Sequence, residues 1–382
     1  MRFAWALALS ATLAGAQATK RDVDIVAPDG LKLKASWYAA AKPGPGVLLL
    51  HQCNGDRKAW DALAAQLADA GISVLTFDLR GYGDSEGERF VPAPPEHKAA
   101  MAQHWPGDID AAFAYLASEP SVDRNRIGVG GASCGVNNAV ETARRHPEVK
   151  SLVLLSGTTS EAGREFLASS DTRPVFVSAS RGDDDALPYM QWLALFLHDP
   201  RSRLIACKDA GHGAEMFKVT KTLPASITDF FVSTLTETPR PGARRVAHIS
   251  AATEFWATLT GPEGPARARV ILSERLKKDP LVAPTLFPEV AVNLYGYDRL
   301  QNGDTKSAIE VLELNELAYP NSANVYDSLG DAYLADGQKE QALRYSEKAL
   351  AMLGTNPPDD PDRAKAIRLN SEDRIRKLRG AP

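Results

Sequence analysis

A serine and a cysteine stand side by side in the stretch GGASCG at 130–135, and either could act as a nucleophile. The stretch follows an apolar run at 127–130 that is typical of a strand, and it precedes a helical pattern at 134–145. A strand-turn-helix elbow strains its central residue, and glycines two positions before and after that residue remove side chains that would clash. Both positions are glycine when counted from Ser133, and neither is when counted from Cys134. The spacing therefore predicts that Ser133 is the nucleophile.

Two further motifs follow expected strands in the same part of the chain. His51-Gln-Cys-Asn-Gly comes after the apolar run at 47–50, and RGYGDS comes shortly after the run at 72–77. With the elbow, these motifs make residues 22–236 resemble the α/β-hydrolase family, particularly its small esterases of the dienelactone-hydrolase type. Gln52 departs from the family pattern, which usually has glycine there.

The resemblance implies a base and an acid downstream of the serine, because a hydroxyl needs a held base to take its proton. His212 lies in a Gly-His-Gly turn after the expected strand at 202–207, and it alone of the seven histidines has such a place. Three aspartates follow the expected strand at 174–180. The family's acid commonly lies four residues before a proline, which selects Asp184, with Asp183 as the second choice.

Two backbone N–H groups are also implied, which would bind the oxyanion that forms during attack. By resemblance they belong to Cys53, in the first sheet loop, and to Cys134. Donors that face one anion lie close together, so the two Cα atoms could fall within disulfide range. Three roles stay open for these sulfurs, namely packing, a Cys53–Cys134 bridge formed after export, and redox sensitivity. Cys207, at the end of an expected strand, is expected in the core.

The elements that would position these residues alternate between β-rich runs and amphipathic stretches. A hairpin is expected over 22–38, with Asp29-Gly30 at its turn. Further strands are expected at 47–50, 72–77, 127–130, 151–156, 174–180 and 202–207, and helices at 57–70, 107–117, 134–145, 187–198 and 218–235. Strands that alternate with helices favour right-handed crossovers and a mostly parallel sheet. The predicted fold is an α/β-hydrolase sheet with helices on both faces, followed by an all-α helical-repeat domain.

The helical part begins after a proline- and glycine-rich linker. The expected order is a linker at 237–249, a helical hairpin at 250–288, two repeats at 289–356 and a capping helix at 360–379. An offset of 34 residues aligns Gly296 with Gly330 and Gly303 with Gly337. This period and these small residues resemble the tetratricopeptide repeat.

The amino-terminal residues and the composition suggest where the protein acts. Residues 1–18 have a basic start at Arg2, an apolar run and the ending Ala-Gln-Ala, which predict a signal peptide cleaved after Ala18 and a periplasmic or secreted protein. The alternative is an uncleaved anchor helix. The net charge of −4, without a basic patch, argues against nucleic acid. No metal, phosphate-loop or dinucleotide motif occurs, so no cofactor is implied.

These features predict an exported serine hydrolase that cleaves an ester-like acyl bond in a small-molecule substrate. The short segment between the strands at 151–156 and 174–180 leaves no room for a large lid, so an open cleft is expected. His97, His104 and Trp105 lie in a proline-containing insert and either line this cleft or belong to an exposed loop. The repeats would bind a protein partner or act as an internal buttress. The alternative function is an inactive binding module whose repeats recruit a partner.

Overall fold

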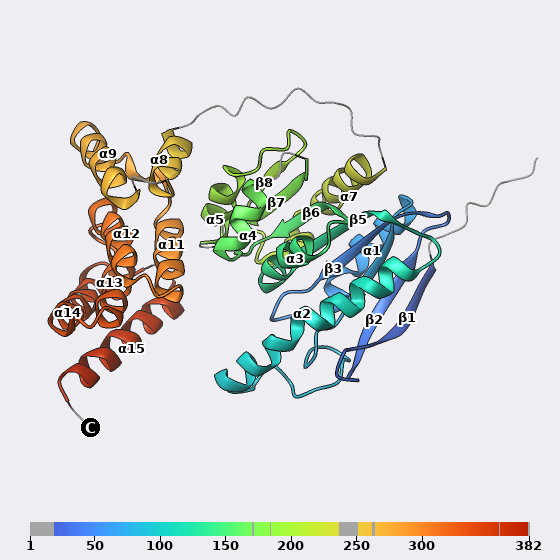
Figure 1. The fold of residues 1–382 in the computed structure, drawn as a ribbon, viewed down its shortest axis with the longest axis horizontal. Helices are drawn as coiled ribbons and strands as arrows, with labels where there is room; N and C mark the ends of the chain where they lie inside the picture. Colours follow the sequence, from blue (N-terminus) through green and yellow to red (C-terminus); the bar gives the residue numbers. More distant parts are fainter. Residues whose placement is uncertain are drawn as a thin grey trace, which may run out of the picture.

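The chain forms an α/β unit up to residue 236 and a helical unit from residue 251 (Figure 1). The structure, a computed structural model, describes residues 19–169, 172–183, 185–236, 251–261, 264–358 and 360–380. The expected signal peptide and linker lie outside these ranges.

The α/β unit is built on an eight-stranded sheet in the order β1-β2-β4-β3-β5-β6-β7-β8. The strands are β1 (Thr19–Val26), β2 (Lys32–Ala39), β3 (Gly44–Leu50), β4 (Ser73–Phe77), β5 (Val122–Ala132), β6 (Val149–Leu155), β7 (Val175–Ser180) and β8 (Arg203–Cys207). The opening hairpin β1–β2 is antiparallel and β2 pairs antiparallel with β4, whereas β3 to β8 pair in parallel. The mostly parallel sheet predicted from the alternating pattern is confirmed.

Helices cover both faces of the sheet, because the central strands are apolar on both sides. The segments of this unit are η1 (Arg57–Trp60), α1 (Asp61–Asp69), α2 (Pro95–Ser118), α3 (Cys134–Arg145), α4 (Glu161–Ala168), α5 (Ala186–Ala194), η2 (Gly213–Glu215), α6 (Met216–Val219) and α7 (Leu223–Leu235). On one face, Val47 and Leu49 pack with side chains of α1 and α7. On the other face, Leu48 and Leu50 join a core with α2, α3 and α5.

Helix α2 is longer than predicted. It begins at Pro95 and includes Pro106, whereas the sequence predicted a helix only over 107–117 after an irregular insert. Because proline usually ends or kinks a helix, the sequence placed the start of this helix after Pro106. In the folded protein Met101, Trp105 and Ile109 are buried along one side of α2, so packing holds the helix together on both sides of the proline.

Within the described ranges, the helical unit has a first group of three helices, then two helical hairpins and a final helix. Its helices are α8 (Ala251–Leu259), α9 (Gly264–Lys278), α10 (Ala283–Leu286), α11 (Glu289–Gln301), α12 (Thr305–Ala318), α13 (Ala323–Ala335), α14 (Lys339–Thr355) and α15 (Pro361–Leu378). Gly303 and Gly337 both have positive φ, 78° and 79°, in the turns of the hairpins α11–α12 and α13–α14. The tetratricopeptide assignment itself stays a prediction. No helix in the described ranges has both the length and the apolar character needed to cross a membrane.

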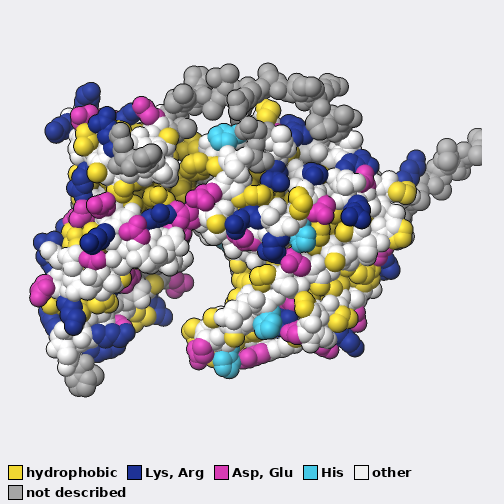
Figure 2. Space-filling view, viewed as in Figure 1, with side chains coloured by type: hydrophobic (Ala, Val, Ile, Leu, Met, Phe, Trp, Pro, Cys, Tyr) yellow, Lys and Arg dark blue, Asp and Glu magenta, His cyan; other side chains and the backbone are white. Residues whose placement is uncertain are grey.

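The two units share one hydrophobic core. The rings of Trp192 on α5 and Trp256 on α8 lie 4.6 Å apart between centroids, and Trp256 also contacts Tyr295 on α11. Next to them, Arg164 on α4 forms a largely buried ion pair with Asp298 on α11. Figure 2 shows a notch below this contact, between the helical unit and the unit that carries α2. The helical unit is therefore docked on the α/β unit through α4 and α5.

Candidate active site

Ser133 stands in a sharp turn between β5 and α3. Its φ of 53° and ψ of −121° lie where side chains are strained. A Cβ at Gly131 would lie 2.0 Å from the carbonyl oxygen of Gly135, and a Cβ at Gly135 would lie 2.5 Å from the carbonyl oxygen of Leu50. Only glycine fits at these two positions, as the elbow spacing required. The turn places Ser133 at the carboxyl end of a central strand.

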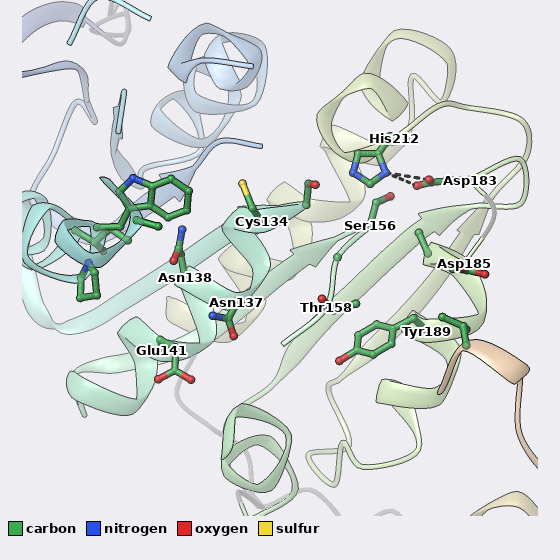
Figure 3. Close-up of a pocket in the computed structure, with 18 of the residues that line it drawn as sticks. Cys134, Asn137, Asn138, Glu141, Ser156, Thr158, Asp183, Asp185, Tyr189 and His212 are labelled. Atoms are coloured by element: carbon green, nitrogen blue, oxygen red, sulfur yellow. Dashed lines mark hydrogen bonds and ion pairs between the residues drawn. The ribbon is translucent and has the colours of Figure 1, made fainter. Parts of the chain in front are cut away.

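His212 follows β8, and a carboxylate that follows β7 holds its ring. The Nδ1 atom of His212 lies 2.9 Å from both Oδ1 and Oδ2 of Asp183, and Figure 3 draws these contacts as dashed lines. Asp184, the acid preferred from the sequence, lies outside the described residues. Among the described residues, Asp183, the second choice, is the one whose carboxylate faces the Nδ1 atom. With Nδ1–H donated to Asp183, Nε2 is left to act as a base.

The hydrogen bond that His212 donates to the carboxylate of Asp183 raises the pKa of His212 above the ordinary value of 6.5, against the opposing effect of burial. The negative charge of Glu215 adds to the rise. Glu215 lies in η2, directly after the histidine turn. The protonated imidazole is thus stabilised, as a base that must accept a proton from a hydroxyl requires.

Ser133 and His212 line the same cavity, which has a volume of about 800 Å³. No hydrogen bond joins the Oγ atom of Ser133 to the His212 ring, although both residues are within the described part of the chain. Such bonds are often long in ligand-free enzymes and tighten when substrate binds. Ser133 and His212 therefore line one cavity without a hydrogen bond between their side chains.

The two cysteines at the expected oxyanion positions form a disulfide, with their Cα atoms 5.8 Å apart. Of the three roles left open for them, the bridge is the one present. Cys134 is the first residue of α3, where backbone N–H groups have no acceptor within the helix. Cys134 borders the main cavity, whereas Cys53 borders a smaller one of about 480 Å³. Cys207 is free and buried, as expected.

Gln52, the residue that departs from the family pattern, connects two parts of the site. Its buried side chain accepts a hydrogen bond from the backbone N–H of Ala214, with a distance of 2.9 Å, through Oε1. Its Nε2 atom donates to Oδ1 of Asn54 at 2.7 Å. The side chain therefore ties the loop after β3 to the turn that carries His212, a role that the sequence did not reveal.

The turn RGYGDS and the preceding Asp78 do not line the cavity that holds Ser133 and His212. Asp78 is fully buried, forms an ion pair with Arg57, and accepts a hydrogen bond from the backbone N–H of Asp84 at 2.8 Å. Arg80 forms ion pairs with the buried Asp108 of α2. These contacts fix the loop after β4 and anchor α2 to it.

Residues from both units line the cavity. They are Ala102, Trp105, Pro106 and Ile109 of α2, Ser133, Cys134, Asn137, Asn138, Glu141 and Arg145 at or on α3, Ser156, Gly157, Thr158, Asp183 and Asp185 on loops, Ala186 and Tyr189 of α5, His212, and Val290 of α11. Of the two alternatives left open for Trp105, a place in the cleft lining or in an exposed loop, the structure shows the first. His97 and His104 do not, and instead lie near the carboxylates of Glu88 and Asp29 on the exposed surface.

Ser156 is a cavity residue that the sequence did not single out. It follows β6, has a φ of 49°, and is 1% exposed. Its hydroxyl has no hydrogen-bond partner, an unusual state for a buried polar group. Figure 3 shows it at the end of its strand, on the side of the cavity that carries His212 and Asp183. A serine directly after an apolar strand is too common to have marked it in the sequence.

Comparison with known proteins supports an α/β-hydrolase. Residues 41–191 match the family described as serine aminopeptidase, S33. An uncharacterized protein of Mycobacterium tuberculosis is 37% identical over 145 residues, which make up 37% of this chain and 47% of that protein. Thiohydrolase aneE of Aspergillus aculeatus is 32% identical over 126 residues, 33% of this chain and 37% of that protein. The chain thus spans less than half the length of these curated relatives.

Among solved structures, the dienelactone hydrolase of Anabaena variabilis is similar over 57% of this chain and 99% of its own, with a TM-score of 0.45 and 18% identity. The esterase Pf2001 of Pyrococcus furiosus is similar over 57% of this chain and 93% of its own, with a TM-score of 0.45 and 18% identity.

Proposed function

We propose that the protein is an exported serine hydrolase that cleaves an ester-like acyl bond in a small-molecule substrate. One observation carries this proposal. A serine on a strained elbow opens on the same cavity as a histidine whose far nitrogen is held by a carboxylate. These are the parts that acyl transfer through a covalent intermediate needs.

In the proposed reaction, the Oγ atom of Ser133 attacks the acyl carbon while Nε2 of His212 takes the hydroxyl proton. Asp183 stabilises the imidazolium that results. The carbonyl oxygen becomes an oxyanion, which the backbone N–H groups of Cys134 and Cys53 would bind. The imidazolium then gives its proton to the leaving group as the bond to the acyl carbon breaks. A water, activated by the same nitrogen, releases the acid and restores Ser133.

The cavity lining supports an acyl substrate with both apolar and polar parts. Trp105 and Ile109 give one wall an apolar surface. On α3, the amide side chains of Asn137 and Asn138 give another part of the lining a polar character. Curated relatives named as a thiohydrolase and an acyltransferase point to ester or thioester substrates.

A fluorophosphonate probe tests the nucleophile directly, because it reacts only with an activated serine hydroxyl. We expect the mature protein to be labelled on the peptide that contains Ser133, as located by mass spectrometry, and Ser133→Ala to abolish labelling. Labelling on Ser156 instead would reassign the nucleophile. A panel of acyl esters of graded length, with one thioester and one aminoacyl amide, would then define the bond that is cleaved.

A protein that is not labelled would favour the alternative, an inactive binding module whose helical repeats recruit a partner. The observation that favours this alternative is that Ser133 and His212 are not joined by a hydrogen bond. Immunoprecipitation with the intact chain would then be the appropriate experiment.

Export is proposed from the sequence of residues 1–18, and the Cys53–Cys134 bridge supports it, since disulfides persist mainly in oxidising compartments. We also propose that α11–α14 are tetratricopeptide-like repeats. Amino-terminal sequencing of the protein from a periplasmic or secreted fraction should begin at Thr19. A chain that retains Met1 would point to the anchor helix.

A further inference from the structure

We propose that the helical unit is part of the catalytic apparatus, with Arg363 of α15 as a positioning residue that holds the loop carrying Asp183. The inference rests on the proposed function, since it assigns Asp183 as the acid of that site. It goes further by making a residue far along the chain, outside the α/β unit, necessary for full activity.

Arg363 makes a bidentate contact with the loop between β7 and α5, which carries Asp183 and Asp185 and is called the acid loop below. Nη1 of Arg363 donates to Oδ1 of Asp185 at 3.0 Å, and Nη2 donates to Oδ2 at 2.6 Å. Planar pairing of this kind fixes orientation as well as distance. Asp185 follows Asp183 by two residues, and the backbone N–H of Ala186 donates to the carbonyl oxygen of Asp183 at 2.8 Å. Restraint of Asp185 is therefore transmitted to Asp183 within one turn of the chain.

The side chain of Asp185 is directed to Arg363 and not to its own helix. Asp185 occupies the N-cap of α5, where aspartate usually accepts a hydrogen bond from the first turn of its own helix. Here its side chain makes no capping hydrogen bond. Both carboxylate oxygens face α15 instead. In Figure 1 the amino end of α15, where Arg363 lies, points toward the α/β unit.

The far side of the same loop is supported by the helical unit as well. Helix α5 continues directly from the loop, with one side against β7 and another against α11. Trp192 of α5 packs on Trp256, and Val290 of α11 reaches the cavity wall. The acid loop therefore lies between a rigid strand and two contacts made by the helical unit.

Loosening this loop should weaken the hydrogen bond that Nδ1–H of His212 donates to the carboxylate of Asp183. Among the described residues, the charged groups that face His212 are Asp183 and, from η2, Glu215, with Asp185 on the rim of the same cavity. Loss of the Asp183 contact removes the main influence that favours the protonated ring, while burial and Glu215 remain. The expected change is a lower pKa for His212 and a slower reaction at Ser133.

The experiment compares full-length Arg363→Gln with Arg363→Lys and with a matched control, Glu161→Gln. Glu161 on α4 pairs with Arg299 and accepts from Asn302 of the helical unit, at a site outside the cavity. Two readouts are taken on each protein. NMR of labelled histidine, with His212→Gln for assignment, gives the pKa of His212 without any need for catalysis. Fluorophosphonate labelling gives the reactivity of Ser133.

In Arg363→Gln we expect the pKa of His212 to be lower than in the wild type, and labelling to slow by up to about fivefold, as suits a partly exposed ion pair. Arg363→Lys should recover part of both, and Glu161→Gln should match the wild type. An unchanged His212 pKa in Arg363→Gln, or an equal fall in Glu161→Gln, would overturn the proposal.

Two checks keep the result decisive. If Arg363→Gln does not fold, as judged by circular dichroism, Asp185→Asn removes the same pair from the other side and is titrated in its place. If the wild type is not labelled at all, the proposed function fails, while the titration of His212 still decides whether Arg363 holds the loop.

Discussion

At the scale of single residues, the two nitrogens of His212 have different tasks. Nδ1 is held by both oxygens of Asp183, each at 2.9 Å, and this leaves Nε2 available on the cavity side. The ring is about a third exposed. The hydrogen bond that it donates to the carboxylate has a larger effect than burial and raises the pKa of His212. The same contact that orients the base thus also sets the pH at which it loses its proton.

This geometry predicts the pH dependence of activity. Attack requires neutral His212, so kcat/KM should rise with pH through a midpoint above 6.5 and fall about tenfold for each unit below that midpoint. In Asp183→Asn the midpoint should move to lower pH, because the stabilising charge is gone, and the plateau should fall roughly 10³- to 10⁴-fold. Steady-state kinetics from pH 5 to 9 would check both, over a range of about four units that spans the histidine pKa.

A neighbouring position supplies the control for that measurement. Asp209→Asn removes an aspartate of the loop before His212 that is not among the residues lining the cavity. A midpoint that stays in place in Asp183→Asn would show that another group holds the ring.

At the scale of elements, the site is assembled where strands end. Ser133 follows β5, the loop with Asp183 follows β7, and His212 follows β8. The carboxyl ends of parallel strands lie on one edge of a sheet, so residues far apart in sequence meet there. Two side-chain links then fix the loops, namely the Cys53–Cys134 bridge to α3 and the bond of Gln52 to the histidine turn.

The disulfide should matter for both rate and stability. In Cys53→Ala/Cys134→Ala the backbone N–H groups at 53 and 134 are no longer held together by the bridge. We expect kcat to fall about tenfold, less than the 10²- to 10³-fold typical of losing one oxyanion donor completely. The bridge spans 81 residues, so the free energy of unfolding should fall by about 2–4 kcal/mol. Active-site titration and urea unfolding would measure these effects.

Cys207→Ala serves as the comparison, since it removes a buried sulfur that does not line the cavity. Iodoacetamide labelling of denatured, unreduced wild type should find one thiol per chain, and three would contradict the bridge. A double variant with unchanged kcat would mean that the sulfurs only stabilise the fold.

At the scale of the whole molecule, the two units are joined by a continuous core. Buried side chains run from the α2–α3 face of the sheet through Tyr189 and Trp192 to Phe255 and Trp256 of the helical unit. The ion pair of Arg164 with Asp298 lies beside this core, and burial raises the pKa of Asp298. A contact of this kind is typical of parts that fold together rather than of domains joined only by a linker.

We therefore expect a single cooperative unfolding transition that reports both units. Trp256→Ala, which removes a side chain 1% exposed, should lower the free energy of unfolding by about 3–5 kcal/mol. It should also split the transition, because it loosens the contact between the units. Denaturant unfolding followed by circular dichroism and by labelling of the active site would reveal the split.

Leu329→Ala provides the contrast, since this leucine is buried in a cluster confined to the helical unit. Leu329→Ala should lower the free energy of unfolding, but circular dichroism and active-site labelling should still report one transition. Equal behaviour of the two variants would argue against a shared core.

The sequence by itself determined the features that depend on neighbouring residues. The glycine spacing around Ser133 and the alternation of strands and helices follow from local sterics and hydrophobic patterning, and each is visible in a short window. The contact between Asp183 and His212 could not be read there, because the two residues are 29 positions apart in the chain. Only tertiary structure decided that contact, the pairing of Cys53 with Cys134, and the contact of α15 with Asp185, since each depends on how distant segments meet in space.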